Sequence, residues 1–197
     1  DIIFTGVYLC NSGLVVPTRV NLVGNRAHVA GNLNRNAARL VFTGLGINTR
    51  AVTVGSDVQI RGMVISGPGE GVSGTYGIYG GVSSSENLGS NSQLIDCTIE
   101  DFETPVVFSR WLNVIENCAI DDCITGINLL DAANHTVIRN NRINPGNASP
   151  KVCVNINGAL QGVIILENNF EDLYYGIVVV RGQGIVIAHN RFEIINK

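Results

Sequence analysis

The chain has 197 residues, of which 45% are hydrophobic and 15% are charged, so it has enough apolar side chains for a core and is not expected to be disordered. A formal net charge of −3 provides no basic surface for a nucleic acid, and no apolar run is long enough to cross a membrane. These values exclude nucleic-acid binding and membrane insertion, and they favour one domain.

The chain starts at Asp1–Phe4 with a short apolar segment and no basic region before it, so no signal peptide is seen. Its cysteines are odd in number and lack the paired C-x-x-C spacing of a zinc site. We expect reduced thiols in a protein that folds in a reducing cytoplasm. No cofactor is predicted; calcium is left open, although no ligand motif for it is seen. The cysteines are Cys10, Cys97, Cys118, Cys123 and Cys153.

A pattern of apolar residues recurs between residues 60 and 192. Each copy has two apolar residues five positions apart, with a small polar or sulfur-containing residue two positions before the second one. The second apolar residues are Ile65, Ile99, Ile120, Ile143, Phe170 and Phe192, at steps of 34, 21, 23, 27 and 22 positions. A period of this size is typical of a solenoid, whose coils would hold about 21 to 27 residues.

Each repeat contains three short strand-like segments. In one repeat the first is Thr136–Ile138, the second begins at Ile143 after a tight turn, and the third is Val152–Ile156. β-branched residues and period-two alternation favour strands, and no window has the 3.6-residue period of a capped helix. The sequence predicts an all-β fold, a parallel β-helix formed by a single domain over residues 1–197.

The turn between the first two strands carries Asn141, Asn168 and Asn190 at equivalent positions, with Cys97 and Cys118 in earlier repeats. Stacked coils lie about 4.8 Å apart, so each amide can bond to the same amide one coil further along. Asparagine also tolerates the left-handed backbone that we expect at this turn. We interpret this Asn/Cys ladder as structural and assign it no catalytic role.

The longest step contains a Gly- and Ser-rich segment, residues 66–91, which we interpret as a loop excursion; residues 144–150 form a smaller one. Long loops on a rigid scaffold often bind ligands, so residues 66–91 are the first place to look for specificity. A surface loop without function is the alternative. The last repeat ends at Lys197 without a capping segment, so we expect the chain to be a segment of a longer protein or to pack against a partner.

Two parts of the sequence resemble a known superfamily. The start, with Gly6-Val-Tyr8, Leu14–Pro17 and Val20–Gly24, resembles the first coils of pectate-lyase-like right-handed β-helix proteins. The Asn-bearing coils from Val114 to Phe192 resemble the same superfamily. The resemblance implies a right-handed parallel β-helix. Phage tailspikes and related polysaccharide depolymerases look closest, because they share reduced cysteines, the absence of a signal peptide and irregular coils.

This resemblance implies a homotrimer that binds and cleaves a bacterial surface polysaccharide, located in a virion tail or at the contact with a host cell surface. No catalytic residue carries over from the superfamily. The sequence lacks the Trp-x-Asp-His motif of calcium-dependent lyases, the Gly-His-Gly and Arg-Ile-Lys motifs of polygalacturonases, and the Asp-Pro-His motif of alginate epimerases. Asp121-Asp122 resembles the polygalacturonase aspartate pair, but a dipeptide is weak evidence.

Acidic pairs follow the second strand of several repeats. Hydrolysis of a glycosidic bond needs one protonated and one ionised carboxyl group. Glu100-Asp101 and Asp121-Asp122 occupy equivalent positions, so Glu100 and Asp121 would lie about 5 Å apart, close enough for like charges to raise one pKa. We predict that these four acids are catalytic. The alternative is that they are solvated turn residues.

Charged residues also end the third strand. Arg110, Asp131 and Arg181 each lie four residues beyond its first apolar position, and Asn128 lies on its exposed side. Arginine binds sugar carboxylates through two parallel hydrogen bonds. We predict substrate binding by the two arginines and Asn128, and a catalytic base or salt-bridge partner in Asp131. A surface ion-pair ladder is the alternative. Because the two clusters lie at different edges, at most one is expected to be the principal site.

Aromatic side chains that could stack on sugar rings are the last candidates. We predict substrate binding by Trp111, Tyr76 and Tyr79, and we note Tyr174 and Tyr175 as further aromatics. Trp111 begins a coil directly after Arg110, which places it beside the second cluster. Packing of its ring at a corner of the coil is the alternative.

Three functions agree with this sequence. The first is cleavage of a surface polysaccharide, by hydrolysis or by elimination. The second is a non-catalytic receptor-binding or structural shaft, favoured by the Ser, Thr, Asn and Val side chains around residues 82–91. The third is a sugar epimerase of the alginate type.

Overall fold

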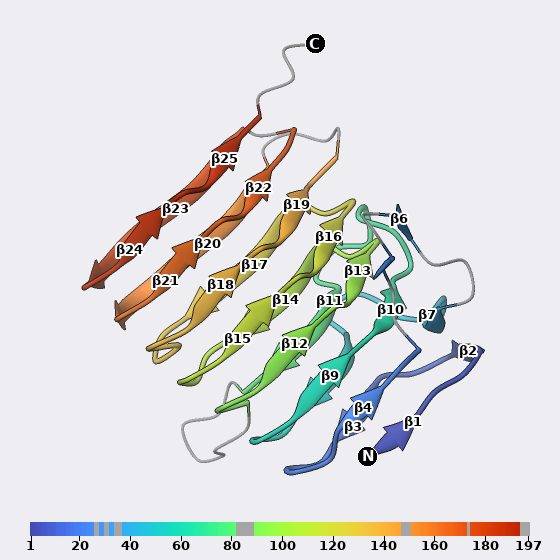
Figure 1. The fold of residues 1–197 in the computed structure, drawn as a ribbon. Coiled ribbons are helices and arrows are strands. Elements are labelled where there is room, and N and C mark those ends of the chain that lie inside the picture. The colour runs from blue at the N-terminus through green and yellow to red at the C-terminus, as the bar shows by residue number, and fades with distance from the viewer. Residues whose placement is uncertain are drawn as a thin grey trace.

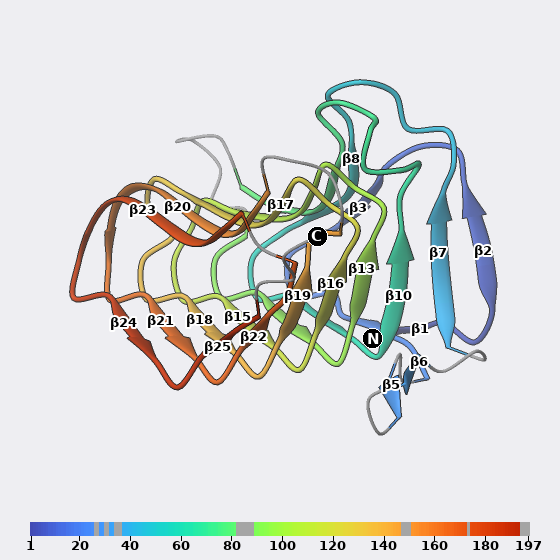
Figure 2. The ribbon, with the colours of Figure 1, turned by 90° about the horizontal axis from the view of Figure 1, so that it is seen from above.

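The computed structural model describes residues 1–25, 28–29, 32–33, 37–81, 89–146, 151–172 and 174–193. These residues form strands and turns and contain no helix, and therefore none that could cross a membrane. The chain winds as a solenoid in which successive coils add one strand to each of three parallel sheets (Figure 1). The coils stack in sequence order, so the colours run from blue to red along the axis (Figure 2).

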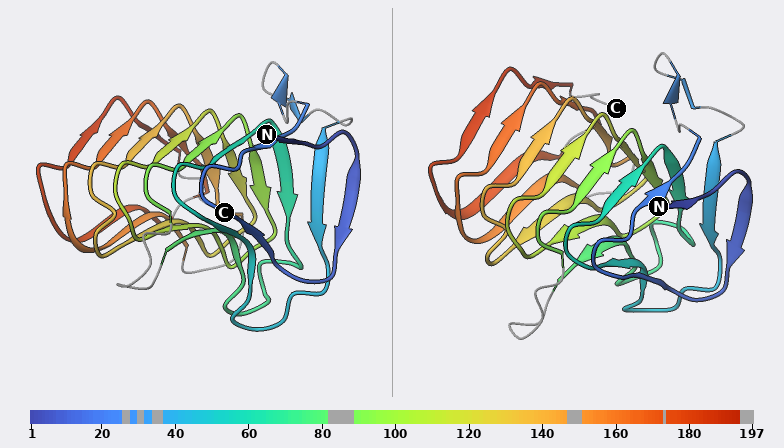
Figure 3. Two further views of the ribbon diagram at one scale, coloured as in Figure 1. Left: turned by 90° about the horizontal axis from the view of Figure 1, so that it is seen from below. Right: turned by 60° about the horizontal axis from the view of Figure 1, so that its bottom comes forward.

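Each of the three sheets runs along the solenoid axis, with its strands in chain order. Sheet A comprises β1 (Ile2–Ile3), β4 (Leu22–Val23), β9 (Gln59–Arg61), β12 (Gln93–Ile95), β15 (Val114–Glu116), β18 (Val137–Arg139), β21 (Ile164–Leu166) and β24 (Val186–Ala188). Sheet B comprises β2 (Val7–Cys10), β7 (Ala38–Phe42), β10 (Met63–Ser66), β13 (Thr98–Glu100), β16 (Ala119–Asp121), β19 (Arg142–Asn144), β22 (Asn169–Phe170) and β25 (Arg191–Phe192). Sheet C comprises β3 (Leu14–Val16), β8 (Arg50–Val54), β11 (Tyr76–Gly80), β14 (Thr104–Phe108), β17 (Thr125–Leu130), β20 (Val152–Gln161) and β23 (Tyr175–Gln183). An antiparallel pair, β5 (His28–Val29) and β6 (Asn32–Leu33), lies beside the N-terminal coils (Figure 3).

The register of the sheets confirms the predicted repeat. The first apolar residues of the repeats pair along sheet A from Ile60 to Ile187, and the second pair along sheet B from Ile65 to Phe192. The predicted third strands form sheet C. In the middle coils the central residue of each three-residue strand is buried, as at Ile115, because the sheets turn it toward one shared core.

The predicted asparagine ladder is present, but its backbone differs from the expectation. Asn141 Nδ2 donates to Asn168 Oδ1 at 3.0 Å, and Asn168 Nδ2 donates to Asn190 Oδ1 at 2.9 Å. The left-handed residue is the one before each ladder position, for example Asn140 with φ 55°. The reason is that the left-handed residue makes the turn. The side chain of the following ladder residue then points inward, where it forms hydrogen bonds with backbone groups of the adjacent coils.

The thiols of the ladder make the same kind of contact as the amides. Asn141 Nδ2 donates to the carbonyl of Ile115 in the preceding coil, and Cys118 Sγ lies 3.5 Å from the corresponding carbonyl of Leu94. Cys97 Sγ lies 3.5 Å from Ile60 O. All five cysteines are free, as predicted, and burial raises the pKa of the Cys123 thiol. Either asparagine or cysteine can therefore occupy this column of the ladder, because each side chain contacts the equivalent carbonyl of the preceding coil.

The segment interpreted as one excursion contains a strand. Tyr76–Gly80 is β11 of sheet C, so residues 66–91 are two connections with a core strand between them. The first connection, residues 67–75, is anchored to the next coil by bonds such as Gly69 N to Asp101 O at 2.9 Å. Most of the second, together with part of the smaller excursion at 144–150, lies outside the described residues.

Candidate functional site

The first cluster lies at the corner where sheet B turns toward sheet C. Glu100 at the end of β13 pairs in register with Asp121 at the end of β16, so the predicted juxtaposition of these acids is present. Asp101 and Asp122 follow them in the turn. We call these four residues the acidic corner.

Arginines form ion pairs with two acids of this corner, Glu100 and Asp121. Arg39 Nη1 lies 3.2 Å from Glu100 Oε1, which also accepts a 2.7 Å hydrogen bond from Ser66 Oγ. Arg142 lies 2.7 Å from Asp121 and 3.7 Å from Glu171 of the following coil. These contacts form an ion-pair ladder at the acidic corner. Such a ladder was the alternative interpretation of the other cluster, that of Arg110, Asp131 and Arg181.

The protonation of Asp121 is perturbed by its surroundings. Burial raises the pKa of Asp121 to about 6; Arg142 opposes this effect, and the charges of Asp122, Glu100 and Glu171 add to it. Its Oδ1 is buried and has no hydrogen-bond partner in the described part of the chain. A proton on this carboxyl group is therefore easier to keep at mildly acidic pH than on an ordinary aspartate.

Asp101 and Asp122 have the geometry of turn residues. Their φ angles are 64° and 47°, in the left-handed region that aspartate tolerates better than most residues. Burial is the main cause that raises the pKa of Asp101, with smaller contributions from Glu100, Asp122 and Glu70. The conformation gives both residues a structural reason to be acidic, which agrees with the alternative interpretation of them as turn residues.

A buried lysine beside this corner was missed in the sequence. The side chain of Lys151 is 1% exposed. Its Nζ lies 2.6 Å from Oε2 of Glu70, a residue of the first connection in the 66–91 segment, and it also donates a hydrogen bond to the carbonyl of Pro145. It precedes an alternating strand, where a lysine is normally solvated, and its partner is 81 positions away. No local pattern could have revealed the contact.

The second cluster forms a groove at the end of sheet C. Arg110 follows β14, Asp131 follows β17 and Arg181 lies in β23, and the structure brings these predicted residues to one cavity of about 510 Å³. We call this cavity the groove. Its lining consists of Ser109, Arg110, Leu130, Asp131, Ala132, Asn157, Gly158 and Arg181.

A β-bulge shapes the groove and was not predicted. The pairing of β20 with β23 shifts between Ile156 and Ala159, which places Asn157 and Gly158 in the lining. A Cβ atom on Gly158 would lie 2.4 Å from Asp131 Oδ1 and 2.8 Å from Asp131 N, so glycine is required for this close approach. The Asn157-Gly158 dipeptide is the signal in the sequence that could have indicated the bulge.

Other predicted binding residues lie outside the groove. Asn128 lies on the outer face of sheet C and accepts a 3.2 Å hydrogen bond from Asn155. Tyr79 is 6% exposed, and the guanidinium of Arg50 covers its ring at 3.8 Å from the centroid; Tyr76 contacts it edge-on at 5.3 Å. Trp111 follows Arg110 and is 53% exposed, so among Trp111, Tyr76 and Tyr79 it is the ring that solvent reaches most freely.

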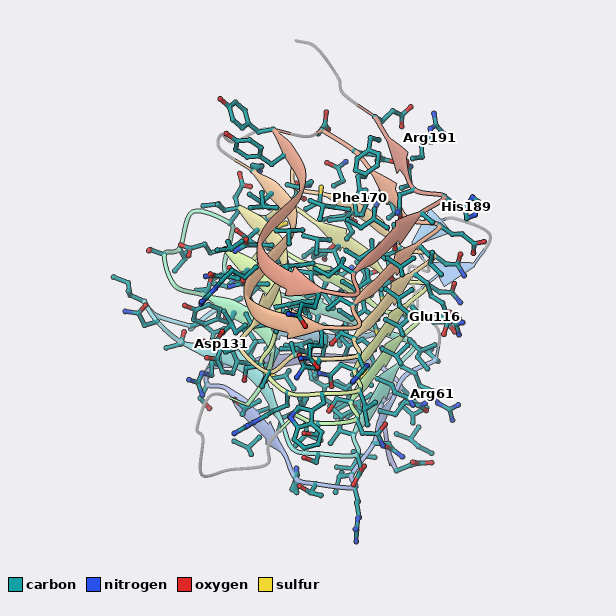
Figure 4. The ribbon with its side chains drawn as sticks, turned by 90° about the vertical axis from the view of Figure 1, so that its left-hand side faces the viewer. Arg61, Glu116, Asp131, Phe170, His189 and Arg191 are labelled. Atoms are coloured by element: carbon teal, nitrogen blue, oxygen red, sulfur yellow. The ribbon has the colours of Figure 1, made fainter. Side chains whose placement is uncertain are left out.

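The described residues contain no group of three or more His, Cys, Asp and Glu side chains arranged to hold a metal ion. Asp131 lies on the opposite side of the solenoid from Glu116 and Arg61 of sheet A (Figure 4). The outer face of sheet A can therefore serve as a control surface for substitutions in the groove.

Comparison with known families shows which family the chain belongs to. Residues 43–196 match the model of the family described as right-handed beta helix region. No curated protein and no solved structure matches the chain.

Proposed function

The chain belongs to the right-handed β-helix family, and from this premise we propose that it binds a bacterial surface polysaccharide in the groove at the end of sheet C. The three parallel sheets form an all-β right-handed parallel β-helix, which is the fold of this family. The observation that supports the proposal is the assembly of Arg110, Asp131, Asn157 and Arg181 in one cavity. These residues come from four successive coils, so the surface repeats along an axis, as a polymer does.

The groove has the chemistry of a sugar-binding site. Guanidinium groups donate hydrogen bonds in a fixed geometry, Asp131 accepts them, and the amide of Asn157 does both, which together match the hydroxyl groups of a sugar. Its volume lies within the range of about 300 to 1,000 Å³ usual for small-ligand pockets. Its side chains project from or beside strands rather than from long loops, so their spacing is fixed before a ligand arrives.

A binding screen tests this proposal. The protein is applied to an array of bacterial capsular and O-antigen polysaccharides, and the affinity for each bound polymer is measured by calorimetry. We expect Asp131→Asn to weaken binding about tenfold, while Arg139→Gln on sheet A leaves it unchanged. Absence of binding to every polymer, or equal loss with both variants, would contradict the proposal.

Hydrolysis at the acidic corner is a second candidate, favoured by the separate environments of Glu100 and Asp121. Asp121 would give its proton to the glycosidic oxygen as the bond to the anomeric carbon breaks. Glu100 would attack this carbon as the nucleophile, and water that gives its proton to Asp121 would then release the sugar from Glu100. This covalent route follows from the register, because the two residues lie about 4.8 Å apart along the axis and a general-base route needs room for a water between the carboxyl groups.

Product analysis separates the enzymatic candidates. New reducing ends would indicate hydrolysis, and absorbance of an unsaturated product would indicate elimination. A Glu100→Gln variant that keeps both binding and cleavage would exclude the acidic corner. Binding without any cleavage would favour the receptor-binding or structural shaft, and a changed sugar configuration in an intact polymer would favour an epimerase.

Assembly and location form part of the proposal. We propose a homotrimer in a virion tail or at the contact with a host cell surface, because a β-helix with polymer-binding grooves on several copies gains avidity. Gel filtration with light scattering tests the assembly, and a monomer at full length would contradict it.

A further inference from the structure

Two thiols lie next to each other in the Asn/Cys ladder. Cys97 and Cys118 directly precede β13 and β16, whose pairing of Thr98 with Ala119 places the two cysteines at equivalent positions of successive coils. Their side chains are buried, with exposed fractions of 0% and 3%. A hydrogen bond from the Cys118 thiol is the largest cause that lowers the pKa of Cys97, so the two sulfur atoms lie within reach of each other. Further coils flank the pair on both sides.

The spacing of the coils admits a bridging atom between these thiols and disfavours a direct bond. A disulfide needs Cβ atoms about 3.8 Å apart. Side chains that project in parallel from stacked coils keep the coil spacing of about 4.8 Å, and both thiols are free. Two metal–sulfur bonds of about 2.3 Å, the length found for zinc, together span about 4.6 Å. The pair is therefore spaced for one metal ion held in line between two sulfur atoms.

The ligand set selects the kind of metal. In the part of the chain that the structure describes, no third His, Cys, Asp or Glu joins the pair, so the four ligands that zinc prefers are missing. Met63 opposes Cys97 on the other side, because Val64 pairs with Thr98. Its side chain extends toward the preceding coil, where a Cβ atom on Gly24 would lie 2.7 Å from Met63 Cγ, so we do not count its sulfur as a ligand. Two soft thiolates suit a soft ion of low coordination number, such as Cu(I).

The pair lies directly behind the surface of the solenoid. Asp96 and Asn117 precede the two cysteines and make left-handed turns, with φ of 54° and 53°. Asn117 is exposed, so a local opening of its turn would uncover a sulfur atom without separating the sheets. The carboxylate of Asp96 acts electrostatically on Cys97, and it would attract a cation to this turn. These turns therefore give an ion a short path to the thiols.

We propose that Cys97 and Cys118 form a binding site for Cu(I), with both sulfur atoms bonded to the ion in a nearly linear arrangement. Each thiol gives its proton to the solvent as its sulfur–copper bond forms, so one Cu(I) replaces two protons and no electron is transferred. The asparagines of the ladder keep their structural role. The site lies in the core and apart from the groove, so this inference goes beyond the proposed function.

A competition titration tests the site. The reduced protein is titrated anaerobically with Cu(I) in the presence of a chromophoric chelator of known affinity, and X-ray absorption spectroscopy identifies the atoms bonded to copper. We expect one tightly bound Cu(I) per chain with two sulfur neighbours, and a higher melting temperature of the loaded protein. Absence of binding, or copper bonded to a single sulfur atom or to nitrogen and oxygen, would overturn the inference.

Cys118→Asn separates the metal site from the ladder. Asparagine occupies the same column at Asn141 and bonds there to the equivalent carbonyl, so we expect this variant to fold while its Cu(I) affinity falls by about 100-fold or more. Cys153→Ala is the control, because Cys153 is a buried free thiol outside the ladder, and it should keep the native affinity. Circular dichroism checks that each variant is folded. Native affinity in Cys118→Asn, or an equal loss in Cys153→Ala, would contradict the site. Polysaccharide binding should be the same in all three proteins, so failure here leaves the proposed function standing.

Discussion

The acidic corner and the groove use charged residues in opposite ways. At the corner, Glu100 and Asp121 contact arginines of other coils, and Lys151 is buried against Glu70. In the groove, Asp131 and Arg181 are exposed and line a cavity. Both clusters arise from the same repetition of one position per coil. Periodic charge on a β-helix is therefore not evidence of function by itself, and the useful distinction is whether neighbouring coils or solvent contact the charged groups.

The largest expected effect tests the corner. Glu70→Gln removes the carboxylate and leaves the buried ammonium group of Lys151 without its charge partner, so we expect the free energy of unfolding to fall by about 3 kcal/mol. Urea denaturation followed by circular dichroism measures this loss. Arg181→Gln in the groove should change it by less than about 0.5 kcal/mol. If the two variants lose similar stability, the contrast between the two regions is wrong.

The next effect concerns Asp121 and pH. Its pKa in the folded protein, about 6, lies above the ordinary value of 3.8, so the folded state holds the proton more tightly than the unfolded state. Its contribution to stability is fully present below about pH 4 and is lost as pH rises through 6, by about 2 to 3 kcal/mol. Asp121→Asn should therefore gain this much relative to the native protein between pH 4 and pH 7.5. A stability difference that is constant over this range would contradict the assignment.

A smaller effect tests how the groove is built. Gly158→Ala places a Cβ atom against the backbone and carboxylate of Asp131, so we expect a loss of about 1 to 2 kcal/mol in stability and weaker polysaccharide binding. Thermal denaturation and calorimetry measure the two losses. Gly46→Ala is the control, because a Cβ atom there would meet nothing within 4 Å. Similar results for both alanine variants would show that the close approach at Gly158 has no role.

The smallest expected effect concerns the ion pair between Asp121 and Arg142. Arg142→Gln removes the charge that lowers the pKa of Asp121, so this pKa should rise above about 6. Stability should change by less than about 1 kcal/mol, because the Arg142 side chain is 45% exposed. Nuclear magnetic resonance titration of the Asp121 carboxyl carbon measures the shift. A pKa that falls or stays the same would show that the charge of Arg142 does not lower the pKa of Asp121.

The fold could be predicted because it depends on a repeated pattern. Apolar residues such as Ile115 and Ile138 recur at positions that only a stacked coil brings into one column, and the register confirms this placement. The left-handed residue was assigned one position too late, at Asn141 rather than Asn140, because asparagine is suited to both positions. The difference depends on side-chain direction, which the sequence pattern does not contain.

The site could be predicted only where it follows the period. Arg110, Asp131 and Arg181 repeat at the end of the third strand, and they meet in the groove. Asn157 and Gly158 enter through a bulge, which is a local break in the register. Lys151 and Glu70 lie in connections between strands, where no period applies and only the three-dimensional arrangement brings them together.

The contact between Lys151 and Glu70 has a consequence for how the solenoid unfolds. In a stack of coils each unit normally touches only its nearest neighbours, so cooperativity along the axis decays from one interface to the next. Glu70 precedes β11 and Lys151 precedes β20, three strands further along sheet C. This ion pair couples coils that are not adjacent, and it makes the block between them behave as a single cooperative unit. Native-state hydrogen exchange should then show the amides of β11, β14, β17 and β20 opening together, while the terminal coils open independently.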